Sequence, residues 1–293
     1  MTYTIQKVAV LGAGTMGHGI AQVAALSGYE VTLQDLDRAA LDRGVGHIRE
    51  TTATSVDKGK LSHEARTEAM ARLRSTTDLL EAVAEADLVI EAVPERIDLK
   101  IRLFQELGQR APDGAILATN TSSLSVTEIA SSASRPERVV GMHFFNPPHV
   151  LKLLEIVRAQ QTTPEVVEAV RGVGERMGRE LIVVSDSPGF ATSRLGLVIG
   201  LEAMRMLQEG VANAADIDRA MELGYRHPMG PLKLTDLVGL DVRLAIAEHL
   251  HRELGEQFRP PQILRRLVRA GKLGRKTGEG FYRWTADGPV PAQ

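Results

Sequence analysis

The sequence has no cysteine among its 293 residues, which excludes disulfides, thiol catalysis and cysteine-ligated metal sites. Its net charge is only −2, with 35 basic and 37 acidic residues mixed along the chain, so a nucleic acid or a membrane surface is not expected as a partner. No apolar run approaches the roughly 20 residues that span a membrane. The first predicted strand begins close to Met1, which leaves no room for a signal peptide. We therefore expect a cytoplasmic protein without a metal site.

Hydrophobic residues make up 43% of the chain, enough to bury the core of one large domain or two ordinary ones. The strongest motif follows an apolar stretch at 7–11 and precedes a helical pattern that closes at Gly28. It has the spacing G-x-G-x-x-G, in which the first glycine makes a tight turn, the second lets a pyrophosphate approach, and the third packs helix against strand. The helix N-terminus adds free N–H groups. The candidate cofactor-binding residues of this loop are Gly12, Gly14, Thr15, Met16 and Gly17.

A second strand is predicted at 30–34 and ends at Asp35, about twenty residues after the glycine loop. An acidic side chain at this place accepts hydrogen bonds from the ribose hydroxyls of a dinucleotide. Asp35 favours NAD, because the 2′-phosphate of NADP would meet a carboxylate. Arg38 is the one nearby residue that favours NADP instead.

The rest of the first half alternates between predicted strands and helices, as in a parallel sheet. The predicted strands are 87–93, 115–119, 138–142, 153–157 and 180–185, with helices at 99–110 and 164–177 between them. Residues 39 to about 73 contain many helix formers, interrupted at Gly59, with Ser62 as a helix cap, so we predict an inserted αα-hairpin arm.

The pattern changes at Asp186, and everything downstream has helical periodicity. We predict an α/β Rossmann-like domain at 1–186 and an all-α domain at 187–293. Several of the C-terminal helices are apolar on more than one face, which predicts packing against a partner subunit or against the first domain.

His143 is the histidine best placed for chemistry, because it ends a buried strand at the edge where open α/β sheets bind ligands. Histidine suits the removal of a hydroxyl proton near neutral pH. Glu155 lies in an apolar stretch of the next strand and needs a partner, since an unpaired buried charge is costly. Ser122, after the strand at 115–119, could bind the same substrate oxygen. From spacing alone, an internal His143–Glu155 pair with a structural role is an equally good interpretation. The polar cluster that contains Ser122 could instead be an ordinary cap of the helix that starts at Val126.

Six further phrases occur in a defined order along the chain. They are Glu-Ala-Val-Pro-Glu at 91–95, Asn-Thr-Ser-Ser-Leu-Ser at 120–125, His-Phe-Phe-Asn-Pro at 143–147, Ser-Pro-Gly-Phe at 187–190, His-Pro-Met-Gly-Pro at 227–231 and a glycine-rich segment at 274–282. Together with the glycine loop, they resemble the L-3-hydroxyacyl-CoA dehydrogenase family, most closely its short bacterial 3-hydroxybutyryl-CoA dehydrogenases. The resemblance covers nearly the whole chain.

This resemblance implies reversible, NAD-dependent oxidation of an (S)-3-hydroxyacyl-CoA thioester to the 3-ketoacyl-CoA, by a homodimer that associates through its helical domain. It implies that His143 is the catalytic base, Glu155 its partner and Ser122 a contact of the substrate oxygen. It further implies cofactor contacts for Glu95, Lys100 and Asn120, and coenzyme A contacts for Thr51 and Lys58.

The chain departs from the family pattern in one phrase, Pro-Gly-Phe-Ala-Thr-Ser-Arg, where relatives usually have asparagine in place of Ser193. The family pattern places that residue near the substrate oxygen, so this departure leaves the identity of the substrate undetermined. A hydroxy acid without coenzyme A, as in the related gulonate and carnitine dehydrogenases, is the first alternative. A non-catalytic NAD-binding protein is the second. The β-hydroxyacid dehydrogenases with a catalytic lysine fit less well, because they lack the His-Phe-Phe-Asn-Pro phrase.

Overall fold

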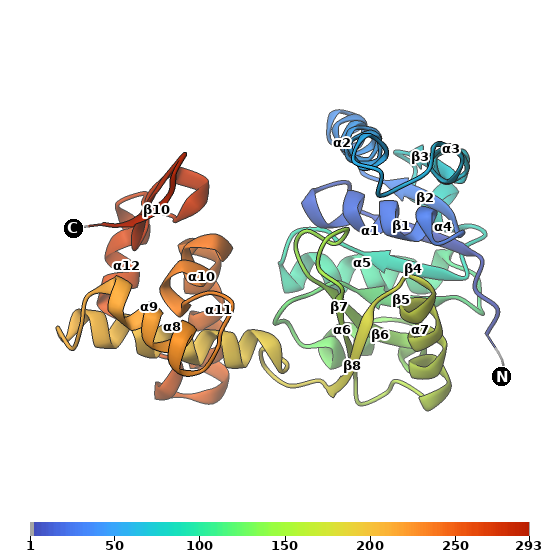
Figure 1. Ribbon diagram of the computed structural model, residues 1–293. Coiled ribbons are helices and arrows are strands. Elements are labelled where there is room, and N and C mark those ends of the chain that lie inside the picture. Colours follow the sequence, from blue (N-terminus) through green and yellow to red (C-terminus); the bar gives the residue numbers. More distant parts are fainter. Residues whose placement is uncertain (1–2, 293) are drawn as a thin grey trace. The chain divides into compact units, whose positions relative to one another are not determined.

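The computed structural model describes residues 3–292, which form two compact units (Figure 1). The first unit ends at Ser187 and the second begins at Pro188.

The first unit is built on an eight-stranded sheet with the order β3-β2-β1-β4-β5-β6-β7-β8. Its strands are β1 (Lys7–Leu11), β2 (Glu30–Gln34), β3 (Leu73–Thr76), β4 (Leu88–Glu91), β5 (Ile116–Thr119), β6 (Val139–Phe144), β7 (Leu153–Arg158) and β8 (Glu180–Ser185). All neighbours are parallel except β6 and β7. The segment 145–152 is too short for a crossover, so the chain turns back and β7 pairs antiparallel to β6.

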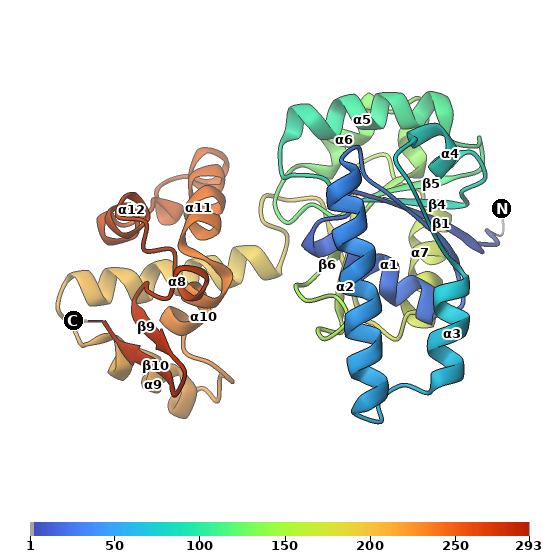
Figure 2. The ribbon, with the colours of Figure 1, turned by 90° about the horizontal axis from the view of Figure 1, so that it is seen from above.

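Helices cover both faces of this sheet, which is why its central strands are apolar on both sides. The helices α1 (Thr15–Leu26) and α7 (Pro164–Arg176) lie on one face, and α4 (Leu79–Val83), α5 (Ile97–Arg110) and α6 (Val126–Ser132) lie on the other (Figure 2). Val10 and Ile90 of the central strands have no exposed surface. The predicted Rossmann-like domain is therefore confirmed.

Two further helices, α2 (Arg38–Asp57) and α3 (His63–Ala71), lie side by side where the arm is predicted (Figure 2). Their first turns are capped by Asp37 and Ser62, whose side chains accept hydrogen bonds from backbone N–H groups. The short strand β3 that follows is an addition to the predicted fold. It is an edge strand, and Arg74 and Ser75 at its centre are exposed, so it lacks the apolar pattern of a buried strand.

The second unit is mainly helical, as predicted, and carries a short antiparallel hairpin that the sequence pattern does not predict. Its elements are α8 (Thr192–Gln208), α9 (Ala214–Gly224), α10 (Pro231–Val238), α11 (Leu240–Leu254), α12 (Gln262–Arg269), β9 (Tyr282–Thr285) and β10 (Gly288–Pro291). The fully buried carboxylate of Asp236 on α10 accepts the N–H groups of Phe281 and Tyr282 and the indole N–H of Trp284. This long-range attachment holds the hairpin in place, so local periodicity does not reveal it.

Candidate active site

The glycine loop joins β1 to α1 and has the shape of a phosphate cradle. Gly12 has a φ of +95°, and a Cβ there would lie 2.7 Å from the carbonyl oxygen of Ala92. A Cβ on Gly17 would collide with the carbonyl oxygen of Gly12, whereas one on Gly14 would meet nothing within 4 Å. Gly14 also caps α1 without a side-chain hydrogen bond, so no capping side chain accepts the first N–H groups of the helix. The loop therefore fits the pyrophosphate of a dinucleotide.

Asp35 follows β2 and is attached to this loop. One carboxylate oxygen accepts the N–H of Ala13 at 2.8 Å, and the other accepts the N–H of Asp37 at 2.9 Å. Each oxygen keeps a lone pair that can accept a ribose hydroxyl. Arg38 forms an exposed ion pair with Asp42 at 3.0 Å. The guanidinium thus has a carboxylate partner within the chain, and the site fits NAD better than NADP.

His143 and Glu155 are brought together by the antiparallel pairing of β6 and β7, in which they stand directly opposite each other. The imidazole Nδ1 lies 2.9 Å from Glu155 Oε2. His143 is 6% exposed and Glu155 is fully buried. The ring of Phe145 lies beside the imidazole, with centroids 4.4 Å apart. The hydrogen bond at Nδ1 sets the orientation of the ring and the tautomer of the imidazole.

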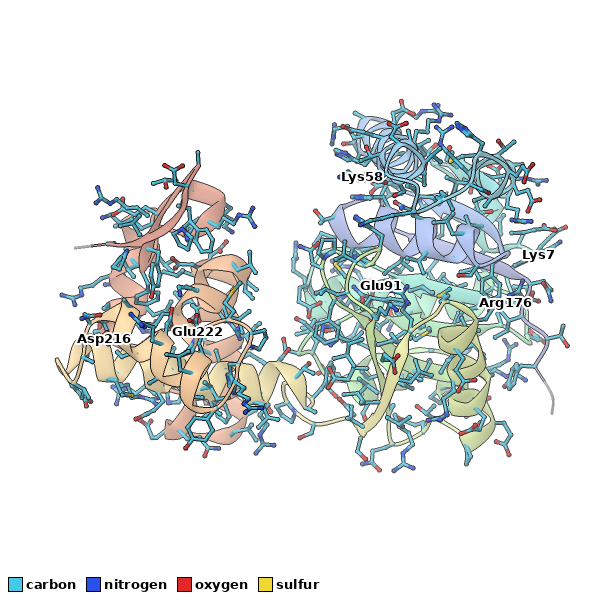
Figure 3. All side chains as sticks on the ribbon, in the orientation of Figure 1. Lys7, Lys58, Glu91, Arg176, Asp216 and Glu222 are labelled. Atoms are coloured by element: carbon cyan, nitrogen blue, oxygen red, sulfur yellow. The ribbon has the colours of Figure 1, made fainter. Side chains whose placement is uncertain are left out.

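A second buried acid, Glu91, ends β4 and organises the neighbouring strand ends (Figure 3). Its Oε1 lies 2.6 Å from the ammonium of Lys100, and its Oε2 accepts the hydroxyl of Thr119 at 2.6 Å. Glu91 and Lys100 have no exposed surface. The Nζ of Lys100 also lies 3.4 Å from Oε2 of Glu95, so the ammonium forms an ion pair with both carboxylates.

Glu95 in turn holds the polar cluster at the end of β5. Its Oε1 accepts the hydroxyl of Thr121 at 2.6 Å and the N–H and hydroxyl of Ser122 at 2.7 and 3.1 Å. Asn120 accepts the N–H of Phe144 at 2.8 Å and thereby joins the ends of β5 and β6. The carboxyl ends of three neighbouring strands therefore form one hydrogen-bonded surface.

Glu91 was not predicted as a site residue, although its position in the sequence indicates a buried carboxylate. Glu91 stands in an almost wholly apolar strand, as Glu155 does, and the argument that a buried carboxylate needs a partner applies equally to both. The partner is Lys100, nine residues later and on a helix, so spacing alone does not identify the pair.

The other predicted residues belong to other elements. The hydroxyl of Thr51 donates to Gln22 on α1 at 2.7 Å, and Lys58 is exposed at the end of α2 (Figure 3). Ser193 belongs to the second unit, where it is half-buried in the first turn of α8. Residues 3–292 hold no cluster of three metal-ligating side chains, and none of their helices is long and apolar enough to cross a membrane.

The comparisons with known proteins agree with this geometry. Residues 7–187 match the NAD-binding domain of 3-hydroxyacyl-CoA dehydrogenase, and residues 189–284 match the C-terminal domain of the same enzyme. A probable 3-hydroxybutyryl-CoA dehydrogenase of Deinococcus radiodurans is 44% identical over 279 residues, covering 95% of this chain and all of the relative. A 3-hydroxyadipyl-CoA dehydrogenase of Escherichia coli is 42% identical over 289 residues, covering 98% of this chain and 61% of the relative.

A solved structure, an (S)-3-hydroxybutyryl-CoA dehydrogenase from Ralstonia eutropha, superposes with a TM-score of 0.92. It is 40% identical, and the match covers 96% of this chain and all of the other. The match of both domain families over nearly the full length, together with the glycine loop and its Asp35, establishes NAD as the cofactor. The chain belongs to the 3-hydroxyacyl-CoA dehydrogenase family.

Proposed function

We propose that this NAD-dependent dehydrogenase interconverts (S)-3-hydroxyacyl-CoA and 3-ketoacyl-CoA thioesters, with His143 as the general base and acid. The observation that carries the proposal is the buried His143–Glu155 pair, whose nitrogen and oxygen lie 2.9 Å apart at the ligand-binding edge of the sheet. The relative named for 3-hydroxybutyryl-CoA suggests a short acyl chain.

In the oxidative direction, Nε2 of His143 accepts the proton of the 3-hydroxyl group as the carbonyl forms. Bound NAD supplies the acceptor for the hydride that leaves C3. Glu155 holds Nδ1 and stabilises the imidazolium, which returns the proton in the reverse direction. Ser122 donates its hydroxyl to the substrate oxygen in exchange for its bond to Glu95, and Ser193 contacts the same oxygen directly or through a water.

Glu95 and Asn120 border the nicotinamide and its ribose, and Lys100 acts on the cofactor through Glu95, because Lys100 has no exposed surface. Thr51 and Lys58 on α2 contact coenzyme A. The exposed ammonium of Lys58 supports this assignment, since it has no carboxylate partner among residues 3–292 and the coenzyme carries phosphates.

The active form proposed is a cytoplasmic homodimer that associates through the helical unit. Support comes from large apolar side chains that remain exposed on α8, α10 and α11, because such groups mark association surfaces. These are Leu195, Ile199, Leu234, Leu237, Val238 and Val242.

The oxidation of NADH with acetoacetyl-CoA, followed by absorbance and compared with free acetoacetate, tests the function. We expect turnover with the thioester alone. Turnover with acetoacetate instead would favour a hydroxy acid without coenzyme A as substrate. NADH binding without turnover of either compound would favour a non-catalytic role.

A further inference from the structure

Two consecutive apolar side chains are exposed in the short segment 145–152 between β6 and β7. Val150 is 60% exposed and Leu151 is 44% exposed. Among residues 3–187, no other large apolar side chains are both exposed and adjacent in the sequence. Single exposed apolar residues are common on protein surfaces, so the meaning of this pair depends on how it is held and on what lies beside it.

The backbone that carries this pair is fixed to the rest of the first unit. The N–H groups of Val150 and Leu151 donate to the carbonyl of Pro147 at 3.0 and 2.9 Å. The Nη1 of Arg179 donates to the carbonyl groups of Pro148 and Leu151 at 2.8 and 3.0 Å. Its Nε donates to a third carbonyl group at 2.8 Å, which fixes the guanidinium itself. One side chain therefore holds the segment at two points, while the two apolar groups stay exposed.

The segment 145–152 lies between the proposed base and helix α1. It begins two residues after His143, at the carboxyl end of β6. Pro148 packs on α1, because a Cβ on Gly19 would lie only 2.8 Å from the proline Cδ. Gln22 follows Gly19 by three residues, so the two share a face of α1. The side chain of Gln22 accepts the hydroxyl of Thr51 on α2 at 2.7 Å. Contacts therefore run from α2 over α1 to this segment and to the end of β6.

The proposed substrate has to span the same elements. The proposed function places its coenzyme A moiety at Thr51 and Lys58 and its reacting carbon at His143. The pantetheine arm joins these two parts of a coenzyme A thioester, so it crosses the region between α2 and the end of β6. This arm consists of methylene groups and a dimethyl-substituted carbon that amide groups connect. Apolar side chains on a fixed backbone are a matching contact for such a chain.

We propose that Val150 and Leu151 form an apolar contact surface for the pantetheine arm, and that Arg179 is the positioning residue of this surface. This inference rests on the proposed function. Binding of the arm removes the two exposed side chains from water, which favours the complex in proportion to the apolar area covered. The arm takes no part in the reaction, so the contact is equally strong in the ground state and in the transition state. Its loss therefore raises KM and leaves kcat unchanged.

The test uses NADH and three acetoacetyl thioesters with progressively shorter thiol parts: acetoacetyl-CoA, acetoacetyl-pantetheine and S-acetoacetyl-N-acetylcysteamine. Pantetheine lacks the nucleotide, and N-acetylcysteamine lacks the dimethyl-substituted carbon as well. We expect the double variant Val150→Ser, Leu151→Ser to raise KM for the two longer thioesters about 10-fold, because part of the apolar area of each side chain is no longer covered. Their kcat should stay unchanged, and the shortest thioester should keep its kcat/KM.

Arg179→Met removes the hydrogen bonds that hold the segment, and we expect the same pattern with a smaller rise in KM. The triple variant that combines all three changes should exceed the double variant by little, because Arg179 acts through the segment. Leu80→Ser, at a 48% exposed position of α4, is the matched control and should leave all three substrates unaffected. NADH affinity, measured by fluorescence titration, should stay the same in every variant.

Each contrary result has a separate meaning. An unchanged KM for acetoacetyl-CoA in the double variant overturns the inference. An equal loss with S-acetoacetyl-N-acetylcysteamine also overturns it, because the segment would then contact the acyl group. An effect of Arg179→Met that simply adds to that of the double variant overturns the positioning role. If the unaltered enzyme turns over none of the three thioesters, the proposed function fails and this inference fails with it.

Discussion

Individual buried carboxylates hold two basic side chains of the first unit in place. Glu155 holds the imidazole of His143, and Glu91 holds the ammonium of Lys100, in both cases without exposed carboxylate surface. The two pairs differ in how much of the basic side chain stays exposed. His143 keeps a small exposed surface, whereas Lys100 keeps none. This difference is consistent with the proposed roles, in which His143 exchanges the proton and Lys100 positions Glu95.

Replacement of the base tests the first of these roles. We expect His143→Ala to reduce kcat by about 10²- to 10⁴-fold, the usual contribution of a general base, while NADH binding stays intact because the glycine loop is unaltered. Steady-state rates and NADH fluorescence titration measure the two effects separately. Turnover within a few-fold of the unaltered enzyme would show that another group accepts the proton.

The Glu91–Lys100 pair predicts a stability effect of its own. Glu91→Gln leaves the buried ammonium with only Glu95 at 3.4 Å, and we expect a loss of about 3–5 kcal/mol in the free energy of unfolding. The double variant Glu91→Gln, Lys100→Met removes the buried charge and should recover most of this loss. Urea denaturation of the three proteins is the measurement. A double variant as unstable as the single one would mean that packing, not charge, causes the loss.

At the scale of elements, one side chain attaches the C-terminal hairpin to the helices. Asp236 on α10 accepts two backbone N–H groups of the segment that enters β9 and the indole N–H of Trp284. Asp218 on α9 does the same for the start of α10, where it accepts the N–H groups of Leu232 and Lys233. The hydroxyl of Tyr282 donates to Asp218 at 2.8 Å. Tyr282 on β9 therefore binds both carboxylates, Asp236 through its backbone N–H and Asp218 through its hydroxyl.

The substitution Asp236→Asn tests this attachment. The amide has a single acceptor oxygen in place of two, and its NH₂ group faces N–H donors, so at least one buried donor loses its partner. We expect a loss of about 2–4 kcal/mol in the free energy of unfolding, measured by urea denaturation. Glu209→Gln, at an exposed end of α8, is the matched control and should change little. Equal stability of the two variants would contradict the attachment.

The same residue predicts a pH dependence with a defined sign. Burial raises the pKa of Asp236 above its unfolded value of about 3.9, so at pH values between these two pKa values the folded chain binds more of this proton than the unfolded chain does. The stability contributed by Asp236 is therefore greatest near pH 4 and falls as the pH rises through the raised pKa. The difference in unfolding free energy between the unaltered protein and Asp236→Asn should shrink between pH 4 and 7. A difference that grows over this range would show that the ionised form is the one stabilised.

At the scale of the whole molecule, the helical unit exposes more apolar surface than a monomer needs. Leu195 is 62% exposed on α8, and Leu237 and Val242 are each more than 40% exposed on α10 and α11. Leu195→Glu places a charge on this surface, and we expect the proposed dimer to dissociate at micromolar concentration. Sedimentation velocity measures the mass, and Glu209→Gln, with its exposed position, serves as the control. A dimer in both proteins would place the contact elsewhere.

Local chemistry explains why much of this protein could be read from its sequence. The glycine loop needs residues without Cβ at Gly12 and Gly17, and Asp35 must follow the second strand. Buried parallel strands must be apolar. Each of these requirements can be recognised from a few consecutive residues. The pairing of His143 with Glu155 was also accessible, because a carboxylate in an apolar strand requires a partner. The short edge strand β3 and the hairpin β9–β10 were not predicted. β3 has exposed residues at its centre, and β9 and β10 are only four residues long each, too short for a clear pattern.

The sequence by itself determined the family, the cofactor and most of the strands and helices of the first unit, because these depend on short motifs with local causes. Apart from the pair of His143 with Glu155, only the tertiary structure decided which buried charges have which partners. It joined Glu91 to Lys100 and attached the hairpin to Asp236. The physical reason is that burial and hydrogen-bond partners depend on segments distant in the chain, which meet only when the helices and strands have packed.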